Sequence, residues 1–279
     1  MARSSRGAGR EGDPPPAPEP LPLPVLDSHT HLDIVGTDSA VQIADAEAVG
    51  VDRLVQVGVD VESSRWGVRL AEEHSGVVAT VALHPNDAPR LADLDEALRE
   101  IESLAAHPRV RAIGETGLDH FRTAEDGRAI QERSFREHIA IAKRYDRTLM
   151  IHDRDAHADV LRVLDEEGAP DRVVMHCFSG DADFAVECLK RGFLLSFAGT
   201  VTFTNARGLR EAAGLTPHES MLVETDAPFL TPMPYRGRPN GSYLIPLTVR
   251  ALAEITGTDL ADLCTAISAN GERVFGPWR

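Results

Sequence analysis

The sequence predicts one domain with the (β/α)8 barrel fold, the TIM barrel, preceded by a short tail. From residue 24 onward, short apolar segments alternate with longer amphipathic segments, as repeated βα units require. Removing residues 1–24 leaves 279 − 24 = 255 residues, close to the roughly 250 of a typical barrel. A doubly wound sheet also alternates strands and helices, but it usually carries a glycine-rich loop after its first strand. Here His-Thr-His follows that strand, which favours the barrel.

Short apolar runs, rich in valine and isoleucine, mark the eight expected strands. They lie at 25–27, 54–57, 77–82, 110–113, 148–151, 173–175, 193–196 and 221–223. Helical periodicity between them is clearest at 91–104, 129–145 and 160–167. The last strand precedes a polar, proline-rich loop at 231–242, and helical segments then continue to about residue 274.

Residues 1–24 combine many prolines with glycines and charges, so we expect a disordered tail and a single barrel domain over 25–279. Residues 1–24 lack the apolar stretch of a secretory signal, and no later segment has a run of about 20 apolar residues. We therefore expect no membrane association. Cys177, Cys188 and Cys264 form no C-x-x-C pair, which is typical of a reducing compartment and predicts a cytoplasmic location.

The formal net charge of −15 excludes the broad basic surface that proteins wrapping duplex DNA use. If the protein acts on nucleic acid, it should hold a short stretch near its site through metal ions and a few arginines. The alternative is a small substrate.

The segment after the first strand carries His29 and His31, two residues apart. On an extended chain such side chains share a face, so both imidazoles can approach one cation. An isolated His-x-His pair is weak evidence, because chance pairs are common.

Further ligand-type residues follow four other strands: Glu115 after the fourth, His152 after the fifth, His176 after the sixth and Asp226 after the eighth. A barrel collects its strand ends at one mouth, where active sites lie. Taken singly, each histidine could be a hydrogen-bonded core residue, and Asp226 could cap a turn. Five such placements together favour a metal site.

The ordered segments that carry these residues resemble the motif series of the TatD family of metal-dependent deoxyribonucleases, in the amidohydrolase superfamily. They read DSHTHLD, LHP, GETGLDHF, IHDRDA, HCFSG and ETDAPFLTP, then RGRPN, and span about 25–275. The resemblance implies that His29, His31, Glu115 and Asp226 hold one metal and that Glu115, His152 and His176 hold a second, with Glu115 bridging. His120, Phe121 and the segment after Asn240 depart from the family pattern, which leaves substrate preference and loop shape open.

Two divalent cations can activate water, polarise a phosphoryl oxygen and stabilise the leaving oxygen of an in-line displacement. We expect Asp226 and Glu115 to be catalytic, with Asp226 orienting the attacking water or accepting its proton. Four imidazoles with two carboxylates suit Zn²⁺, Mn²⁺, Fe²⁺ or Co²⁺ better than Mg²⁺, although availability can override this preference.

Four residues are candidates for substrate binding. Arg154 could clamp a phosphate, with a salt bridge to Asp153 or Asp155 as the alternative. His84 could line the pocket without binding metal, and Arg238 and Asn240 could hold a second phosphate or a base edge, with a solvated loop as the alternative.

Two aromatic residues next to predicted ligands, Phe178 and Phe229, could stack on a nucleobase. Core packing is the better interpretation for at least one of them. Cys177 stands beside His176, but no base is evident for it, so a nucleophilic role is disfavoured.

We therefore expect a monomeric deoxyribonuclease that hydrolyses single-stranded DNA from the 3′ end, with RNA as a further candidate substrate. Alternatives are a hydrolase of a small phosphoester or of an aminoacyl-tRNA-like ester, and a non-catalytic barrel that binds nucleic acid or a protein. Superfamily members that bridge their metals with a carboxylated lysine are disfavoured, because the bridging position carries Glu115 and both lysines, Lys143 and Lys190, lie in helical segments.

Overall fold

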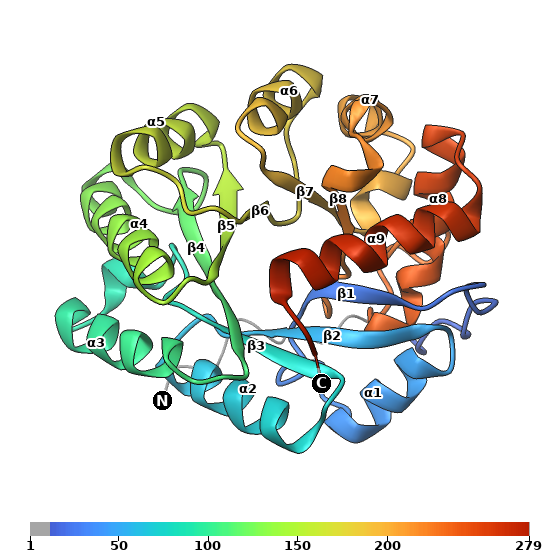
Figure 1. The fold of residues 1–279 in the computed structure, drawn as a ribbon, viewed down its shortest axis with the longest axis horizontal. Coiled ribbons are helices and arrows are strands. Elements are labelled where there is room, and N and C mark those ends of the chain that lie inside the picture. The colour runs from blue at the N-terminus through green and yellow to red at the C-terminus, as the bar shows by residue number, and fades with distance from the viewer. Residues whose placement is uncertain (1–11, 279) are drawn as a thin grey trace.

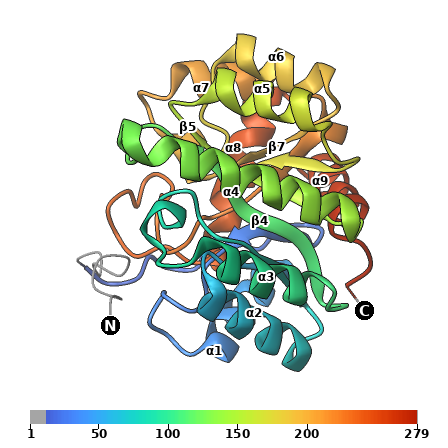
Figure 2. The same cartoon turned by 90° about the vertical axis from the view of Figure 1, so that its left-hand side faces the viewer.

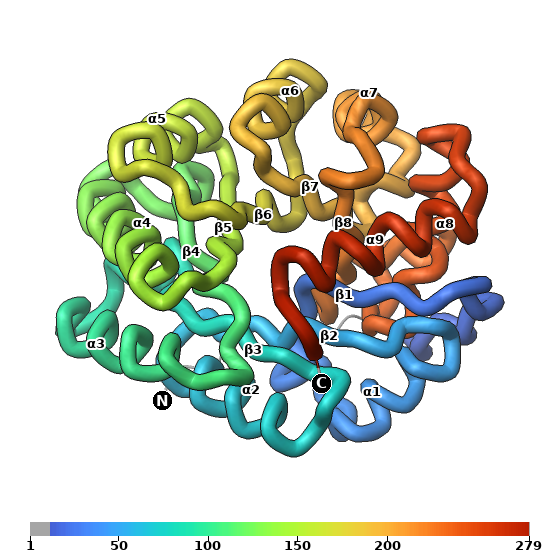
Figure 3. Tube along the Cα trace, in the orientation of Figure 1, coloured from blue at the N-terminus to red at the C-terminus, as the bar shows by residue number. Residues whose placement is uncertain are grey.

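The computed structural model describes residues 12–278 and shows the predicted barrel. Its parallel strands form one sheet in the order of the sequence, and the helices lie outside the ring, except the last one, which crosses one end (Figure 1). The chain can be followed around the ring from β1 to β8 in Figure 3. The strands are β1 (Val25–Thr30), β2 (Val51–Val57), β3 (Val77–Val81), β4 (Val110–Asp119), β5 (Thr148–Arg154), β6 (Val173–Met175), β7 (Leu194–Phe197) and β8 (Met221–Val223).

The outer layer consists of amphipathic helices whose buried positions recur every three or four residues. The three helices with the clearest periodicity are confirmed, with shifted ends; for example, the Asp93 side chain caps the helix predicted at 91–104 by accepting from Glu96 N. The helices are α1 (Ser39–Glu47), α2 (Val61–Glu73), α3 (Leu94–Ala105), α4 (Glu125–Arg144), α5 (His157–Glu167), α6 (Ala182–Lys190), α7 (Arg207–Leu215), α8 (Ile245–Thr256) and α9 (Leu260–Phe275), with short 3-10 turns at Ala88–Arg90, Gly199–Thr202, His218–Ser220 and Ser242–Leu244. Within the described chain, no helix is both long and apolar enough to cross a bilayer.

The ring closes between β1 and the segment that follows β8. Thr30 pairs with Ala227, His31 N donates to Ala227 O at 3.0 Å, and Asp226 N donates to His29 O at 2.9 Å. This closure rules out the open doubly wound sheet. It also brings the His-Thr-His segment beside Asp226, although the two are far apart in the sequence.

The fourth strand is longer than predicted. It continues beyond residue 113, where the predicted strand ends, and Thr116–Asp119 pairs with Ile151–Arg154 of β5. Glycine makes this approach possible, because a Cβ on Gly117 would lie 2.0 Å from His152 O. A register shift between Ile113 and Thr116 marks a bulge at Glu115. Glu115 therefore belongs to a paired strand.

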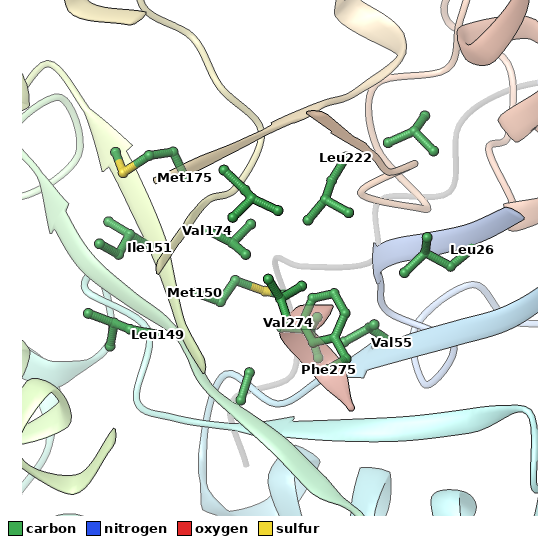
Figure 4. Packing of buried hydrophobic residues seen from close by; sticks show 14 of the residues in the cluster. Leu26, Val55, Leu149, Met150, Ile151, Val174, Met175, Leu222, Val274 and Phe275 are labelled. Atoms are coloured by element: carbon green, nitrogen blue, oxygen red, sulfur yellow. The ribbon is translucent and has the colours of Figure 1, made fainter. Parts of the chain in front are cut away.

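The barrel interior is filled with aliphatic side chains from the strands, including Leu26 and Met150, as Figure 4 shows. At the end where the strands begin, Val274 and Phe275 from α9 pack beside this core, and α9 crosses that end of the barrel (Figures 1 and 4). The opposite end, where the strands finish, is left to the connecting loops (Figure 2). We call the two ends the base and the mouth.

The predicted disordered tail covers residues 1–24, of which residues 1–11 lie outside the described residues and residues 12–24 are described. This segment has no helix and only reaches its first strand at Val25, but it lies along the barrel. Leu21 is buried and its N–H donates to Val49 O, and Arg250 donates to Pro20 O at 3.1 Å. Proline fixes an extended backbone whose carbonyls remain free to accept hydrogen bonds, so a sequence unfit for a core can still pack on a surface.

Candidate metal centre

The structure brings all six predicted metal ligands together at the mouth. His29 and Glu115 lie within strands, His152 lies near the end of β5, and His31 and His176 directly follow strands. Asp226 follows β8 and has a left-handed backbone with φ of 50°, a conformation that Asp tolerates better than most residues. The turn at Asp226 directs its carboxylate back toward the β1 histidines.

The first group of donor atoms consists of His29, His31 and Asp226. The two Nε2 atoms are 3.2 Å apart, and Asp226 Oδ1 lies 3.7 Å from His29 Nε2 and 3.4 Å from His31 Nε2. Glu115 Oε2 lies 3.5 Å from His29 Nε2. These four residues are those of the first predicted ligand set.

The second group surrounds the other oxygen of Glu115. Oε1 lies 2.7 Å from His152 Nδ1 and 3.3 Å from His176 Nε2, the two histidines of the second predicted set. His84 Nε2 also lies 3.3 Å from Oε1. His84 therefore reaches the donor group itself, where the sequence suggested only a pocket-lining residue.

This donor set fits divalent cations. Glu115 is buried, its two oxygens face different histidine groups, and within residues 12–278 neither Glu115 nor Asp226 forms an ion pair with a lysine or arginine. Buried carboxylates without a fixed cation are costly unless histidines or metal ions balance them. A carboxylate with one oxygen toward each group is suited to bridge two cations.

The same contacts control protonation. Burial opposes protonation of His31, but its hydrogen bond with Asp226 outweighs that effect and raises the pKa of His31. Burial would raise the pKa of Glu115, yet the surrounding histidines hold this pKa well below its usual range. A protonated imidazole cannot bind metal, so metal binding must displace these protons.

Glu224 orients His176 and was missed in the sequence. It is fully buried, and its Oε1 lies 2.8 Å from His176 Nδ1, while His176 Nε2 faces Glu115. A carboxylate behind a ligand histidine fixes the ring and increases its basicity. Glu224 lies two residues before the predicted ligand Asp226, and this position is the feature of the sequence that could have indicated its role.

Asp119 has the same relation to His152. Its Oδ2 lies 3.2 Å from His152 Nε2 and accepts from Asn86 Nδ2 at 2.8 Å, while Oδ1 accepts from Arg122 N. Burial opposes ionisation of Asp119, but these hydrogen bonds outweigh it and lower its pKa. Asp119 belongs to the GETGLD motif, so the sequence shows a carboxylate at this position but does not show that it contacts His152.

Asp27 connects the two segments that close the ring. Its carboxylate accepts from Thr225 N at 3.0 Å, from Thr225 Oγ1 at 2.5 Å and from His29 N at 3.2 Å. Complete burial raises the pKa of Asp27 to about 7 despite these bonds. Asp27 thus fixes His29 relative to the segment that carries Asp226.

The predicted substrate residues have different surroundings. The Arg154 guanidinium lies 4.0 Å from the centre of the Phe121 ring and, within the described chain, has no ion pair; Asp153 instead pairs with His157 at 2.7 Å. Arg238 donates to Asp13 O and Pro14 O, so it holds the N-terminal segment.

The structure contradicts the prediction for Asn240. Its side chain is buried, and Nδ2 donates to Thr225 O and Phe229 O while Oδ1 accepts from Gly241 N. Because its amide is committed to the loop backbone, we assign Asn240 a role in holding the loop after β8.

The two candidate stacking residues also differ. Phe178 is buried against Phe184 and Phe197, so it belongs to the core. Phe229 is half-buried, and its ring lies 6.4 Å from that of His31. Burial and nearby carboxylates hold the pKa of Cys177 well above its usual range, which disfavours a reactive thiolate.

Comparison with known proteins agrees with this geometry. The family described as TatD related DNase matches residues 26–276. A metal-dependent hydrolase named TatD from Mycobacterium tuberculosis is 48% identical over 260 residues, covering 90% of this chain and 98% of that protein. A 3'-5' ssDNA/RNA exonuclease named TatD from Citrobacter rodentium is 37% identical over 243 residues, covering 84% of this chain and 90% of that one.

Solved structures share the fold. YjjV, a TatD homologue from Escherichia coli, superposes with a TM-score of 0.85 at 26% identity, covering 90% of this chain and 97% of that chain. An amidohydrolase from Saccharomyces cerevisiae, 17% identical, has the same fold with a TM-score of 0.79, covering 91% and 100%. The chain therefore belongs to the TatD family of metal-dependent hydrolases.

Proposed function

We propose that this hydrolase removes nucleotides from the 3′ end of single-stranded DNA, and also accepts RNA, by hydrolysing phosphodiester bonds. The observation that carries the proposal is the position of Glu115, whose two oxygens each face a separate group of donors at the mouth. His29, His31, Glu115 and Asp226 would hold one cation, and Glu115, His152 and His176 a second. When bound, the two cations supply charge stabilisation for phosphoryl transfer and activation of water.

The carboxylate of Asp226 acts on the attacking water. Its Oδ1 faces the two β1 histidines, and its side chain is 17% exposed, so water can reach it. Burial opposes ionisation, but the His31 contact and the neighbouring histidines lower the pKa of Asp226 and keep it ready to accept a proton. We infer that Asp226 orients the water and takes up its proton.

Arg154 binds a phosphate of the substrate. It lies two residues after His152 on β5, where alternate side chains share a face. With its guanidinium on an aromatic ring and no carboxylate partner among residues 12–278, its donors are available to an anion. A guanidinium can bind two phosphate oxygens at once.

The relative from Citrobacter rodentium supports the choice of substrate, because its name assigns it activity on single-stranded DNA and RNA. The acidic character of this chain also fits a strand held locally at the mouth better than a duplex held across a broad surface.

The test is degradation of 5′-labelled single-stranded DNA by protein reconstituted with Zn²⁺, Mn²⁺ or Mg²⁺. A 3′-end exonuclease gives a ladder of labelled products that shortens with time, and Asp226→Asn should reduce its rate about a thousandfold. Matched RNA, duplex DNA and a simple ester complete the panel. Equal, negligible cleavage by wild type and Asp226→Asn with every metal would refute the nuclease proposal, and cleavage of the ester alone would redirect it.

A further inference from the structure

Phe121 is the most exposed large apolar residue of the described chain, at 61%. It lies in the connection between β4 and α4, and the Arg154 guanidinium carbon lies 4.0 Å from its ring centre. An aromatic side chain left in solvent loses the benefit of burial, so an exposed ring at the mouth of the barrel calls for a partner. The guanidinium covers part of Phe121 but leaves most of it accessible.

A second pair has the same composition on another side of the mouth. Phe203 follows the 3-10 turn after β7, and Arg236 lies in the loop after β8, with its guanidinium carbon 4.2 Å from the Phe203 ring centre. The two pairs come from strands three positions apart around the ring. The metal ligands of β1, β5, β6 and β8 lie in the same mouth.

Arginines on the outer helices are arranged differently. Arg136 contacts Glu132, Glu166 and Glu167, and Arg162 contacts Glu132 at 2.7 Å. In contrast, within residues 12–278 no carboxylate forms an ion pair with Arg154 or Arg236. The chain has a net charge of −15, yet these two guanidiniums contact aromatic rings instead of carboxylates. They therefore remain available to bind an external anion.

We propose that Phe121 with Arg154, and Phe203 with Arg236, are two stacking platforms that bind nucleotides of a single strand on either side of the metal centre. This inference rests on the proposed function. Each ring, or the guanidinium plane on it, stacks on a base, and the guanidinium donates to the adjacent phosphate. Because every base has an aromatic face, the platforms hold a strand without reading its sequence, and they exclude bases that are paired in a duplex.

The test measures binding and cleavage of a short fluorescent single-stranded oligonucleotide by the metal-loaded protein. The variants are Phe121→Ala, Phe203→Ala and Phe121→Trp, with Ile130→Ala as the matched control because Ile130 is an exposed apolar residue on α4. Binding is measured in the Asp226→Asn background, so that the strand stays intact. The same strand with abasic nucleotides in place of normal ones separates stacking from a general effect on structure.

We expect each alanine variant to weaken binding and raise KM about tenfold, the fold-change produced by losing one base–aromatic stack, while kcat changes little. Phe121→Trp should restore binding, and the difference between Phe121→Ala and wild type should disappear on the abasic strand. A merely structural role would weaken binding to both strands equally.

Two results overturn the inference, and they are distinguishable. If wild type cleaves the strand and both alanine variants bind it as Ile130→Ala does, the platforms are wrong and the proposed function stands. If wild type hydrolyses bis(4-nitrophenyl) phosphate but neither binds nor cleaves the strand, the proposed nucleic-acid function fails, and the platforms fail with it.

Discussion

The two ends of the barrel use charged residues in opposite ways. At the base, Arg109 donates to the carbonyls of Ala71, Ser75 and Trp278 at 2.7, 3.0 and 2.6 Å, and Arg111 donates to Pro277 O. At the mouth, histidines and carboxylates face one another around Glu115. At the base, Arg109 and Arg111 thus donate to backbone carbonyls, whereas at the mouth the side chains that could bind a cation lie together.

This difference separates stability from chemistry. The base contacts hold the C-terminal segment after α9 against the starts of β3 and β4, so their loss should affect folding. The mouth gathers buried ionisable side chains, and such groups are maintained for function at some cost in stability. Substitutions at the two ends should therefore change different measured quantities.

The largest effect is expected for His29→Ala combined with His31→Ala. Removing two nitrogen donors should lower the bound metal by at least one equivalent and reduce cleavage of single-stranded DNA about a thousandfold. Elemental analysis and initial rates measure both effects. His74→Ala at the base is the matched control, and unchanged metal content in the double variant would refute the assigned site.

At the base, Arg109→Met should lower the free energy of unfolding by about 3 kcal/mol, because several backbone carbonyls lose their donor. Denaturant unfolding followed by circular dichroism measures this change. Metal content should stay at the wild-type value in the folded variant. A loss of metal without a loss of stability would contradict the division between the two ends.

His138 shows how a histidine just below the mouth is held neutral. Its Nε2 accepts from Leu83 N at 3.0 Å and its Nδ1 donates to Ser134 O at 2.6 Å, and burial lowers its pKa to about 4. Between about pH 6.5 and 4 the unfolded chain binds a proton there that the folded protein does not, so stability falls as pH falls, by about 3 kcal/mol. Metal-free wild type should show this slope, and His138→Asn should show a shallower one; equal slopes would exclude His138 as its source.

The smallest effect is expected for Glu224, which contacts the predicted ligand His176 on the side away from Glu115. Glu224→Gln keeps the shape of the side chain but removes the charge beside His176 Nδ1, and should weaken Mn²⁺ or Zn²⁺ binding about tenfold. Calorimetric titration measures the affinity, with Glu219→Gln, an exposed base residue, as the control. Wild-type affinity in Glu224→Gln would mean that Glu224 does not orient the ligand.

Much of the barrel could be predicted because its signals are local. Alternating apolar runs and amphipathic segments are properties of short windows, and all eight predicted strands are found. The six ligand candidates were visible because a parallel barrel places every strand end at one mouth. His29 and Asp226 could thus be associated without knowing any distance between them.

Other features depend on contacts between distant parts of the chain. β4 can continue beside β5 because residue 117 is a glycine, which leaves room for His152 O, an atom of another strand. Asn240 holds the loop after β8 by donating to backbone carbonyls that no local sequence pattern identifies. The proline-rich segment before β1 could not be recognised as packed, because Arg250 and the Val49 carbonyl, which fix it, belong to other elements.

The sequence by itself determined the fold class, the family and the residue types of the metal centre, because periodicity and ligand chemistry are written along the chain. The tertiary structure decided how Glu115 divides its two oxygens, that His84 joins the second donor group, and which carboxylates stand behind His152 and His176. The physical reason is that these are questions of direction. A side chain's direction depends on strand register and bulges, and these are set by packing between residues far apart in sequence.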